Sequence, residues 1–134
     1  MNVEVTGHAV PRLTRRDITR FVRKVLLALE LDEKVSDVSV AFVDDDAMKN
    51  LNRKFRHKNR TTDVLTFPAE DGCEIVISLD QARRQARQEK HSLATELRYL
   101  LVHGLLHGLG YDHETDDGEM NELEVDVREK VGLD

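Results

Sequence analysis

The most informative stretch of this chain is residues 93–113, LATELRYLLVHGLLHGLGYDH. Leucines occupy nearly every side of a helix drawn through it, which predicts a helix that runs through the protein core. Ser92 is a suitable N-cap residue for this helix. Gly108 and Gly110 interrupt the pattern and predict where the helix ends and the chain turns back.

Three histidines in this stretch predict a metal site. His103 and His107 are four residues apart and therefore share one helix face. The turn after the two glycines can bring His113 to the same point. Neutral imidazoles suit divalent transition metals, and three protein ligands with one open position are typical of catalytic zinc. The sequence therefore predicts one Zn²⁺ per chain, held by these three histidines, with Asp112 and Glu114 as nearby candidates for a fourth ligand.

The spacing of the histidines matches the H-E-x-x-H-x-x-G-x-x-H site of metzincin proteases, with one departure. Gly104 occupies the glutamate position, and that glutamate is the general base of zinc proteases. Its absence argues against peptide hydrolysis by the usual route. Three neutral ligands also leave the full charge of the metal to acidify water and attract an anion. A phosphodiester therefore fits this site better than a peptide.

The rest of the chain predicts a single α/β or α+β domain over residues 1–134. Alternating apolar residues predict strands at 3–5, 38–42, 64–67 and 74–78. Helical spacing predicts helices after Thr14, after 44–46, over 79–90, after Ser92 and through 120–131. A turn at Asp71-Gly72 favours antiparallel pairing of the last two strands. We therefore expect a small mixed sheet of about four strands packed with about five helices.

Composition places further limits on the protein. The one cysteine, Cys73, excludes an internal disulfide, and no secretory signal or long apolar run is present, so we expect a cytoplasmic protein without a membrane span. The net charge is −6 but is unevenly distributed, because residues 53–60 carry five Lys or Arg and no acid. This run indicates either a basic binding face or an ordinary solvated face.

Two motifs resemble those of the YbeY family, bacterial endoribonucleases of ribosomal RNA maturation. HGLLHGLGYDH resembles H-G-x-L-H-L-x-G-Y-D-H, and residues 51–68, LNRKFRHKNRTTDVLTFP, resemble L-N-x-x-[FY]-R-x-x-x-x-x-T-D-V-L-[ST]-F-P. EIVIS at 74–78 is a weaker match to the family's G-D-I-x-I-S. Cys73 and Glu74 replace its Gly-Asp pair, and Gly108 stands where the family usually has Leu.

The resemblance implies a zincin-like fold with the metal-binding helix at its centre and with zinc on His103, His107 and His113. It implies single-strand-specific cleavage in maturation of the small-subunit ribosomal RNA 3′ end, and a part in ribosome quality control. Its partners would be ribosomal RNA and the ribosome or its small subunit. Arg56 and His103 would act at the chemical step, and an arginine suits phosphate because its guanidinium binds two oxygens at once.

Six further residues are weaker candidates. RNA contacts are predicted for Arg53, Lys54, Lys58 and Arg60, with ordinary surface charge as the alternative. Hydrogen bonds that orient a ligand imidazole are predicted for Asp63 and Asp112, with packing, capping or turn formation as the alternative.

Two other functions remain open from the sequence. One is a zincin-type metallopeptidase, which Gly104 opposes. The other is a non-catalytic, zinc-stabilised module that binds RNA or the ribosome through the basic run. This second alternative predicts a fourth protein ligand on the metal, because structural zinc sites are usually closed.

Overall fold

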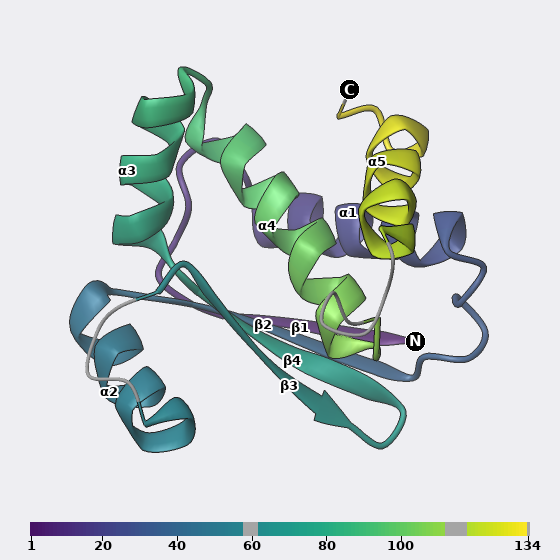
Figure 1. Cartoon of the computed structure of the whole chain (residues 1–134), viewed down its shortest axis with the longest axis horizontal. Coiled ribbons are helices and arrows are strands. Elements are labelled where there is room, and N and C mark those ends of the chain that lie inside the picture. The colour runs from purple at the N-terminus through teal and green to yellow at the C-terminus, as the bar shows by residue number, and fades with distance from the viewer. Residues whose placement is uncertain (58–61, 112–117, 134) are drawn as a thin grey trace.

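The computed structural model describes residues 1–57, 62–111 and 118–133 (Figure 1). The elements in chain order are β1 (Asn2–Gly7), α1 (Arg15–Ala28), β2 (Asp37–Val43), α2 (Asp45–Arg56), β3 (Val64–Ala69), β4 (Gly72–Ser78), α3 (Leu79–Glu89), α4 (Leu93–Gly108) and α5 (Glu119–Lys130). The predicted mixed class is confirmed, with the expected strands and helices in the expected order. No helix in the described ranges is long and apolar enough to cross a membrane.

The four strands form one mixed sheet in the order β1-β2-β4-β3. The strands β1, β2 and β4 are parallel, whereas β3 runs antiparallel to β4, as the turn at Asp71-Gly72 predicted. β3 therefore lies at an edge of the sheet. Pro68 lies inside β3 rather than at its end, and an edge strand tolerates a residue without a backbone N–H.

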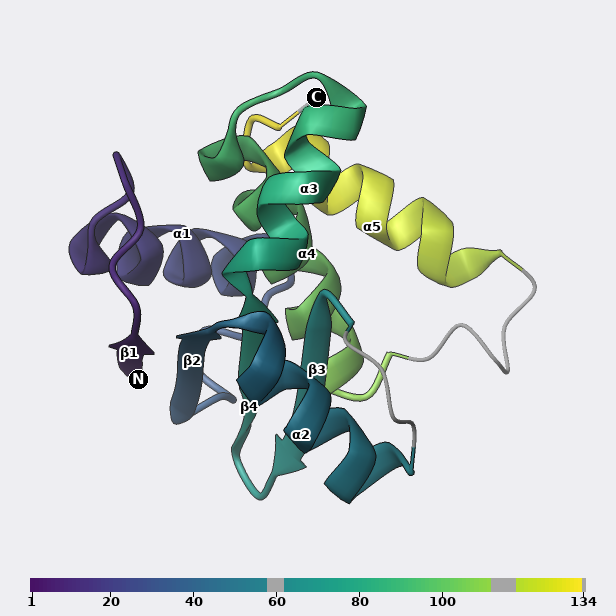
Figure 2. The ribbon, with the colours of Figure 1, turned by 90° about the vertical axis from the view of Figure 1, so that its left-hand side faces the viewer.

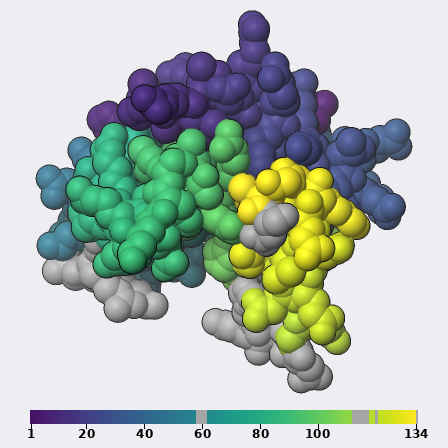
Figure 3. Space-filling model, turned by 90° about the horizontal axis from the view of Figure 1, so that it is seen from above, coloured from purple at the N-terminus to yellow at the C-terminus, as the bar shows by residue number. Residues whose placement is uncertain are grey.

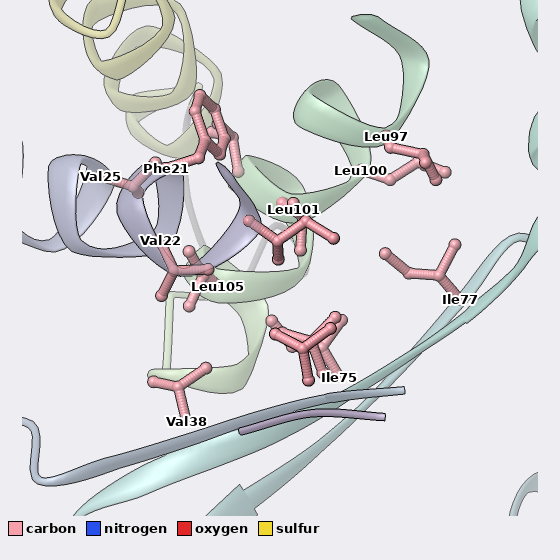
Figure 4. Packing of buried hydrophobic residues seen from close by; sticks show 14 of the residues in the cluster. Phe21, Val22, Val25, Val38, Ile75, Ile77, Leu97, Leu100, Leu101 and Leu105 are labelled. Carbon is pink, nitrogen blue, oxygen red and sulfur yellow. The ribbon is translucent and has the colours of Figure 1, made fainter. Parts of the chain in front are cut away.

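The main core lies between one face of the sheet and helices α1 and α4 (Figure 4). Alternate residues of β2 and β4 point to this face, among them Val38, Ile75 and Ile77. α4 is buried on most sides, which explains why its sequence has no clear polar face. Leu101 and Leu105 of α4 are fully buried at its centre. α4 is thus packed against neighbours on several sides, and this packing fixes the positions of its two histidines.

A second, smaller core lies on the opposite face of the sheet, under α2 (Figure 2). Its buried members are Met48 of α2, Leu65 of β3 and Val76 of β4, with Leu51 partly buried beside them. Phe55 has the same helical spacing as Met48 and Leu51, and it lies in the helix as that spacing indicates, but its side chain is 51% exposed.

The charges of α2 are segregated along its axis. Asp44 caps its N-terminus, accepting the backbone N–H of Ala47 at 2.9 Å, while Arg53, Lys54 and Arg56 occupy its last turn. Acids near the N-terminus and bases near the C-terminus both interact favourably with the helix dipole. The acidic N-terminus and the basic C-terminus thus both suit the dipole of α2, and the last turn forms a cationic end at one side of the molecule.

Cys73 and Gly108 meet where β4 packs against the last turn of α4. A Cβ atom built on Gly108 would lie 2.7 Å from Cys73 Cβ and 2.8 Å from Cys73 Sγ. Such distances are too short for two side chains to coexist. Two of the three positions at which the chain departs from the YbeY pattern, Cys73 and Gly108, are therefore in direct contact, and the small residue on the helix accommodates the larger one on the strand.

We expect Cys73 to be inert in the folded protein. Its side chain is 3% exposed, and burial raises the pKa of its thiol to about 11. Only ~0.1% of such a thiol is thiolate at pH 8, and the thiolate is the reactive form. A chromogenic disulfide reagent should therefore label the native protein far more slowly than the urea-unfolded protein. Leu27→Cys, at a position 63% exposed on α1, supplies a fast-reacting control. Equal rates at both cysteines would contradict the expectation.

Candidate functional site

A polar cleft of about 430 Å³ lies where α2, β3, α3 and α4 meet. Its polar side chains come from all of these elements or from the residues next to them: Asn52, Arg56, Thr62, Asp63, Thr66, Gln81, Gln85, His103 and His107. The edge strand β3 and the central helix α4 thus contribute to one site, together with the cationic end of α2. This is the only described place where a predicted metal ligand and the predicted arginine line the same cavity.

The two histidines of α4 lie side by side in this cleft. Their ring centroids are 4.4 Å apart, with an angle of 58° between the ring planes. This closeness follows from their spacing, since residues four apart share one face of a helix. The third predicted ligand, His113, lies outside the described residues. The structure therefore brings together the two predicted ligands that it describes.

Glu124 of α5 holds the ring of His103. The two side chains are joined by a hydrogen bond of 2.8 Å between His103 Nδ1 and Glu124 Oε1. A carboxylate only accepts, so Nδ1 carries the hydrogen and the lone pair of the neutral ring is on Nε2. The hydrogen bond to Glu124 raises the pKa of His103, while burial acts in the opposite direction. This arrangement is typical of metal-binding histidines, which usually donate their second nitrogen to a carboxylate or carbonyl.

Arg128 in turn holds Glu124. Its Nη2 atom donates to Glu124 Oε2 at 3.1 Å, one helical turn along α5. The guanidinium also lies 5.2 Å from the centre of the Tyr99 ring, a cation–π contact that anchors it against α4. Both oxygens of the largely buried Glu124 are therefore engaged, which fixes the plane of the carboxylate and the ring that it holds.

The sequence did not reveal Glu124. On α5 the sequence indicated only the apolar face, and Glu124 follows Leu123 of that face without any motif of its own. The sequence instead predicts Asp63 and Asp112 as the residues whose hydrogen bonds orient a ligand imidazole. Asp63 does line the cleft, but it accepts the N–H of Val64 at 2.8 Å and the amide of Gln85 at 3.2 Å. Asp112 lies outside the described residues, and its predicted role stays a prediction.

The donor atoms of the cleft fit a nitrogen-ligated transition metal. Two imidazoles share a helix face, and a carboxylate orients one of them. Imidazole ligands suit zinc, copper, iron and nickel, and such ligands usually donate their second nitrogen to a carboxylate or carbonyl. The described residues contain no group of three or more metal-binding side chains. A complete site would therefore need a further ligand from outside the described ranges, which is where the predicted His113 lies.

The basic run contributes one described residue to the cleft, Arg56. Arg53 donates to Asn50 Oδ1 at 2.8 Å, and Lys54 lies over the Phe55 ring with its Nζ 5.3 Å from the ring centre. Lys58 and Arg60 are outside the described residues. Of the predicted cations that the structure describes, Arg56 is therefore the one placed to meet an anion beside the histidines.

Gly104 faces the sheet rather than the open part of the cleft. A Cβ atom at this position would lie 3.1 Å from Ile75 Cγ2 and 3.4 Å from Val64 Cγ2. A side chain at this position would point at the sheet and press on the Ile75 side chain, away from the open part of the cleft. The missing glutamate of the protease pattern therefore reflects the close packing of α4 on β3 and β4.

The fold and the cleft define a mixed α/β protein that carries paired imidazoles and an arginine in one polar site. The family model described as Endoribonuclease YbeY matches residues 3–132. The chain belongs to this family, and the resemblance stated from its motifs is confirmed.

Relatives and a solved structure agree with this assignment. Endoribonuclease YbeY of Nautilia profundicola is 47% identical over 102 residues, which cover 72% of this chain and 73% of the relative. Endoribonuclease YbeY of Solibacter usitatus is 40% identical over 135 residues, or 96% of this chain and 88% of the relative. The solution structure of TM1509 from Thermotoga maritima superposes with a TM-score of 0.69 at 30% identity, covering 97% of this chain and 89% of that one.

Proposed function

We propose that this chain is a zinc-dependent endoribonuclease that cuts single-stranded RNA in the cytoplasm. Its substrate would be the 3′ end of small-subunit ribosomal RNA, on the ribosome or its small subunit, with a further part in ribosome quality control. The curated relatives are named Endoribonuclease YbeY, which supports RNA as the substrate. The observation that carries the proposal is that His103, His107 and Arg56 line one cleft and that Glu124 orients His103.

The residues of the cleft divide the work of phosphodiester cleavage. A divalent ion held by the histidines would supply Lewis acidity and lower the pKa of water. Arg56 would bind two oxygens of the phosphate through its guanidinium and offset the negative charge that develops there. Glu124 keeps His103 in the tautomer that can bind a metal, and Arg128 keeps Glu124 in place.

The packing of Gly104 disfavours the alternative of a metallopeptidase. A zinc protease needs a carboxylate at this position as its general base. Here that position is filled by the contact between α4 and the sheet, with Ile75 and Val64 as neighbours. The cleft offers an arginine instead, which suits an anionic substrate.

The test is cleavage of end-labelled RNA by the purified protein. We expect cuts in single-stranded RNA and in immature small subunits, few cuts in the matching duplex, and no cleavage of unfolded casein. A chelator should abolish cleavage, and added zinc should restore it. Full activity after complete metal removal would exclude metal-dependent catalysis, and casein cleavage would restore the peptidase alternative.

We expect Glu124→Gln to weaken zinc binding by roughly 10- to 100-fold, the usual effect of losing a partner that orients a ligand histidine. The amide keeps the size of the side chain but removes its charge and the preference for one His103 tautomer. Zinc affinity is measured by competition with a chromogenic chelator. The matched control is Glu122→Gln, which changes an exposed residue on the same helix. Equal affinities in the two variants would show that Glu124 does not support the metal site.

A further inference from the structure

An exposed aromatic ring stands beside the cleft without a role in the chemistry described so far. Phe55, in the last turn of α2, is 51% exposed, one of few large apolar side chains so open in the described chain. It makes an edge-to-face contact with Phe67 of β3, with ring centroids 5.3 Å apart and 73° between the planes. This contact fixes the ring at the sheet edge while half of its surface stays in water.

Packing of α2 does not account for this ring. The core beneath the helix is built from Met48, Leu65 and Val76, and these residues are nearly or fully buried. Phe55 stands outside that cluster of buried side chains. A polar residue at this place would expose less apolar surface to water, so the stability of the fold gives little reason for a phenylalanine here.

The neighbours of Phe55 on α2 line the cleft, although Phe55 itself does not. Asn52 and Arg56 both line the cleft, and Phe55 lies three residues after the first and next to the second. Residues three apart share one side of a helix. Phe67 is two residues from Leu65, which also lines the cleft, and both side chains point to the α2 side of β3. The ring contact between Phe55 and Phe67 places the last turn of α2 against β3, the strand that forms this rim.

The charges around the ring favour a polyanion. Arg53, Lys54 and Arg56 surround Phe55 in the last turn of α2, and no acid lies in that turn. Lys54 Nζ lies over one face of the ring, 5.3 Å from its centre, so a cation and an aromatic surface are in contact here. Proteins that bind single-stranded nucleic acid combine these two features, cations for the backbone and aromatic rings for the bases.

We propose that Phe55 is a stacking site for one unpaired nucleobase of an RNA strand whose phosphate lies at Arg56. Phe67 braces the ring from the side, and Lys54 contacts the neighbouring phosphate. Stacking on a phenyl ring accepts any base, because every base has an aromatic face and phenylalanine has no hydrogen-bonding atom. A base paired in a duplex cannot stack in this way, so the site selects for single strands. The identity of the strand as substrate rests on the proposed function.

The chain offers a direct optical test, because it contains no tryptophan. Phe55→Trp places the single tryptophan at the proposed site, and Leu27→Trp places one at a position 63% exposed on α1. The probe is a short, unstructured 2′-O-methyl oligouridine added to the protein as purified. We expect saturable quenching of the tryptophan emission in the Phe55→Trp variant and no quenching in the Leu27→Trp variant. An emission of the Phe55→Trp variant that does not change overturns the proposal.

Kinetics test the same site in the native chain. Phe55→Ala should raise KM for single-stranded RNA by roughly 5- to 100-fold, the usual range for one stacked base, with kcat changed by less than about twofold. Phe55→Tyr should restore KM, and Leu27→Ala should leave it unchanged. Urea unfolding curves show whether the Phe55→Ala protein is folded. If it is not folded, the titration of the Phe55→Trp variant alone tests the stacking site.

The two proposals fail separately. If the wild-type protein does not cut RNA but the Phe55→Trp variant is quenched, the proposed function is wrong and the stacking site stands. If the protein cuts RNA, but the Phe55→Trp emission is not quenched and Phe55→Ala does not change KM, the stacking site is wrong and the proposed function stands.

Discussion

His107→Ala should lose zinc binding and RNA cleavage together, each by at least about a hundredfold. Losing a residue that merely orients a ligand already costs 10- to 100-fold in metal affinity, and a ligand contributes more directly. His107 is half-buried in the cleft beside His103, so the variant removes an imidazole from the pair without opening a cavity in the main core. Metal content of the purified variant and its rate on labelled single-stranded RNA are the two measurements.

The matched control is His8→Ala, which removes an exposed histidine that lies outside the cleft. Its zinc content and rate should equal those of the wild-type protein. Circular dichroism and a urea unfolding curve establish that both variants are folded. A His107→Ala protein that cuts RNA at the wild-type rate would exclude His107 from the site.

Gly108→Leu should destabilise the protein by about 3 kcal/mol or more, because the new side chain must displace Cys73 from its place on β4. A Cβ atom alone already comes within 2.7 Å of Cys73 Cβ. Cys73→Gly should also destabilise the protein, since it leaves a small void and puts a glycine in a strand. The double variant should recover much of this loss, because the glycine on the strand makes room for the leucine on the helix.

The measurement is a double-mutant cycle from urea unfolding curves. We expect a favourable coupling of about 2 kcal/mol or more between the two positions, within the range for residues in direct contact. Gly108→Ala, with its smaller side chain, completes the cycle if the leucine variant does not fold. Additive losses would show that the two positions do not compensate for each other.

The helices and strands were largely predictable because each carries its own local signal. The leucines of α4 and its closing glycines, the alternation of Val38, Val40 and Phe42, and the Thr14–Asp17 cap all act over a few residues. The structure shows that cap as a reciprocal pair of hydrogen bonds, 2.9 Å and 3.1 Å long. Short-range signals of this kind depend only on residues close together in the chain, so the sequence reveals them without knowledge of the tertiary contacts.

The parts of the site that sequence reasoning missed are those made by tertiary contacts. Glu124 has no pattern around it, and its role depends on α5 lying against α4 so that its carboxylate reaches His103. Phe55 has the spacing of a core residue, but the small core under α2 is complete without it. In both cases a contact across space decided the role of the residue, and spacing along the chain does not reveal such a contact.

The contact between Cys73 and Gly108 also explains two departures from the family pattern as one change. From sequence they were separate differences, one on a strand and one at a helix end. In the fold they face each other, and a smaller residue on one side accompanies a larger one on the other. Neither Cys73 nor Gly108 lines the cleft of the histidines and Arg56, so these two departures concern packing rather than chemistry. Glu74, the third departure, is exposed on β4 and does not line the cleft either.

The attachment of α5 has a consequence for the temperature range in which the protein works. α5 is held by the buried side chains of Val127 and Val131 and by a hydrogen bond from Tyr99 Oη to the carbonyl of Leu133, at 3.3 Å. α5 lies at the periphery of the molecule (Figure 3). Peripheral elements of this kind open locally at lower free energy than the core. We therefore expect heat to separate Glu124 from His103 before the sheet unfolds, and we expect mutations that stabilise only the sheet to raise the melting temperature without extending activity.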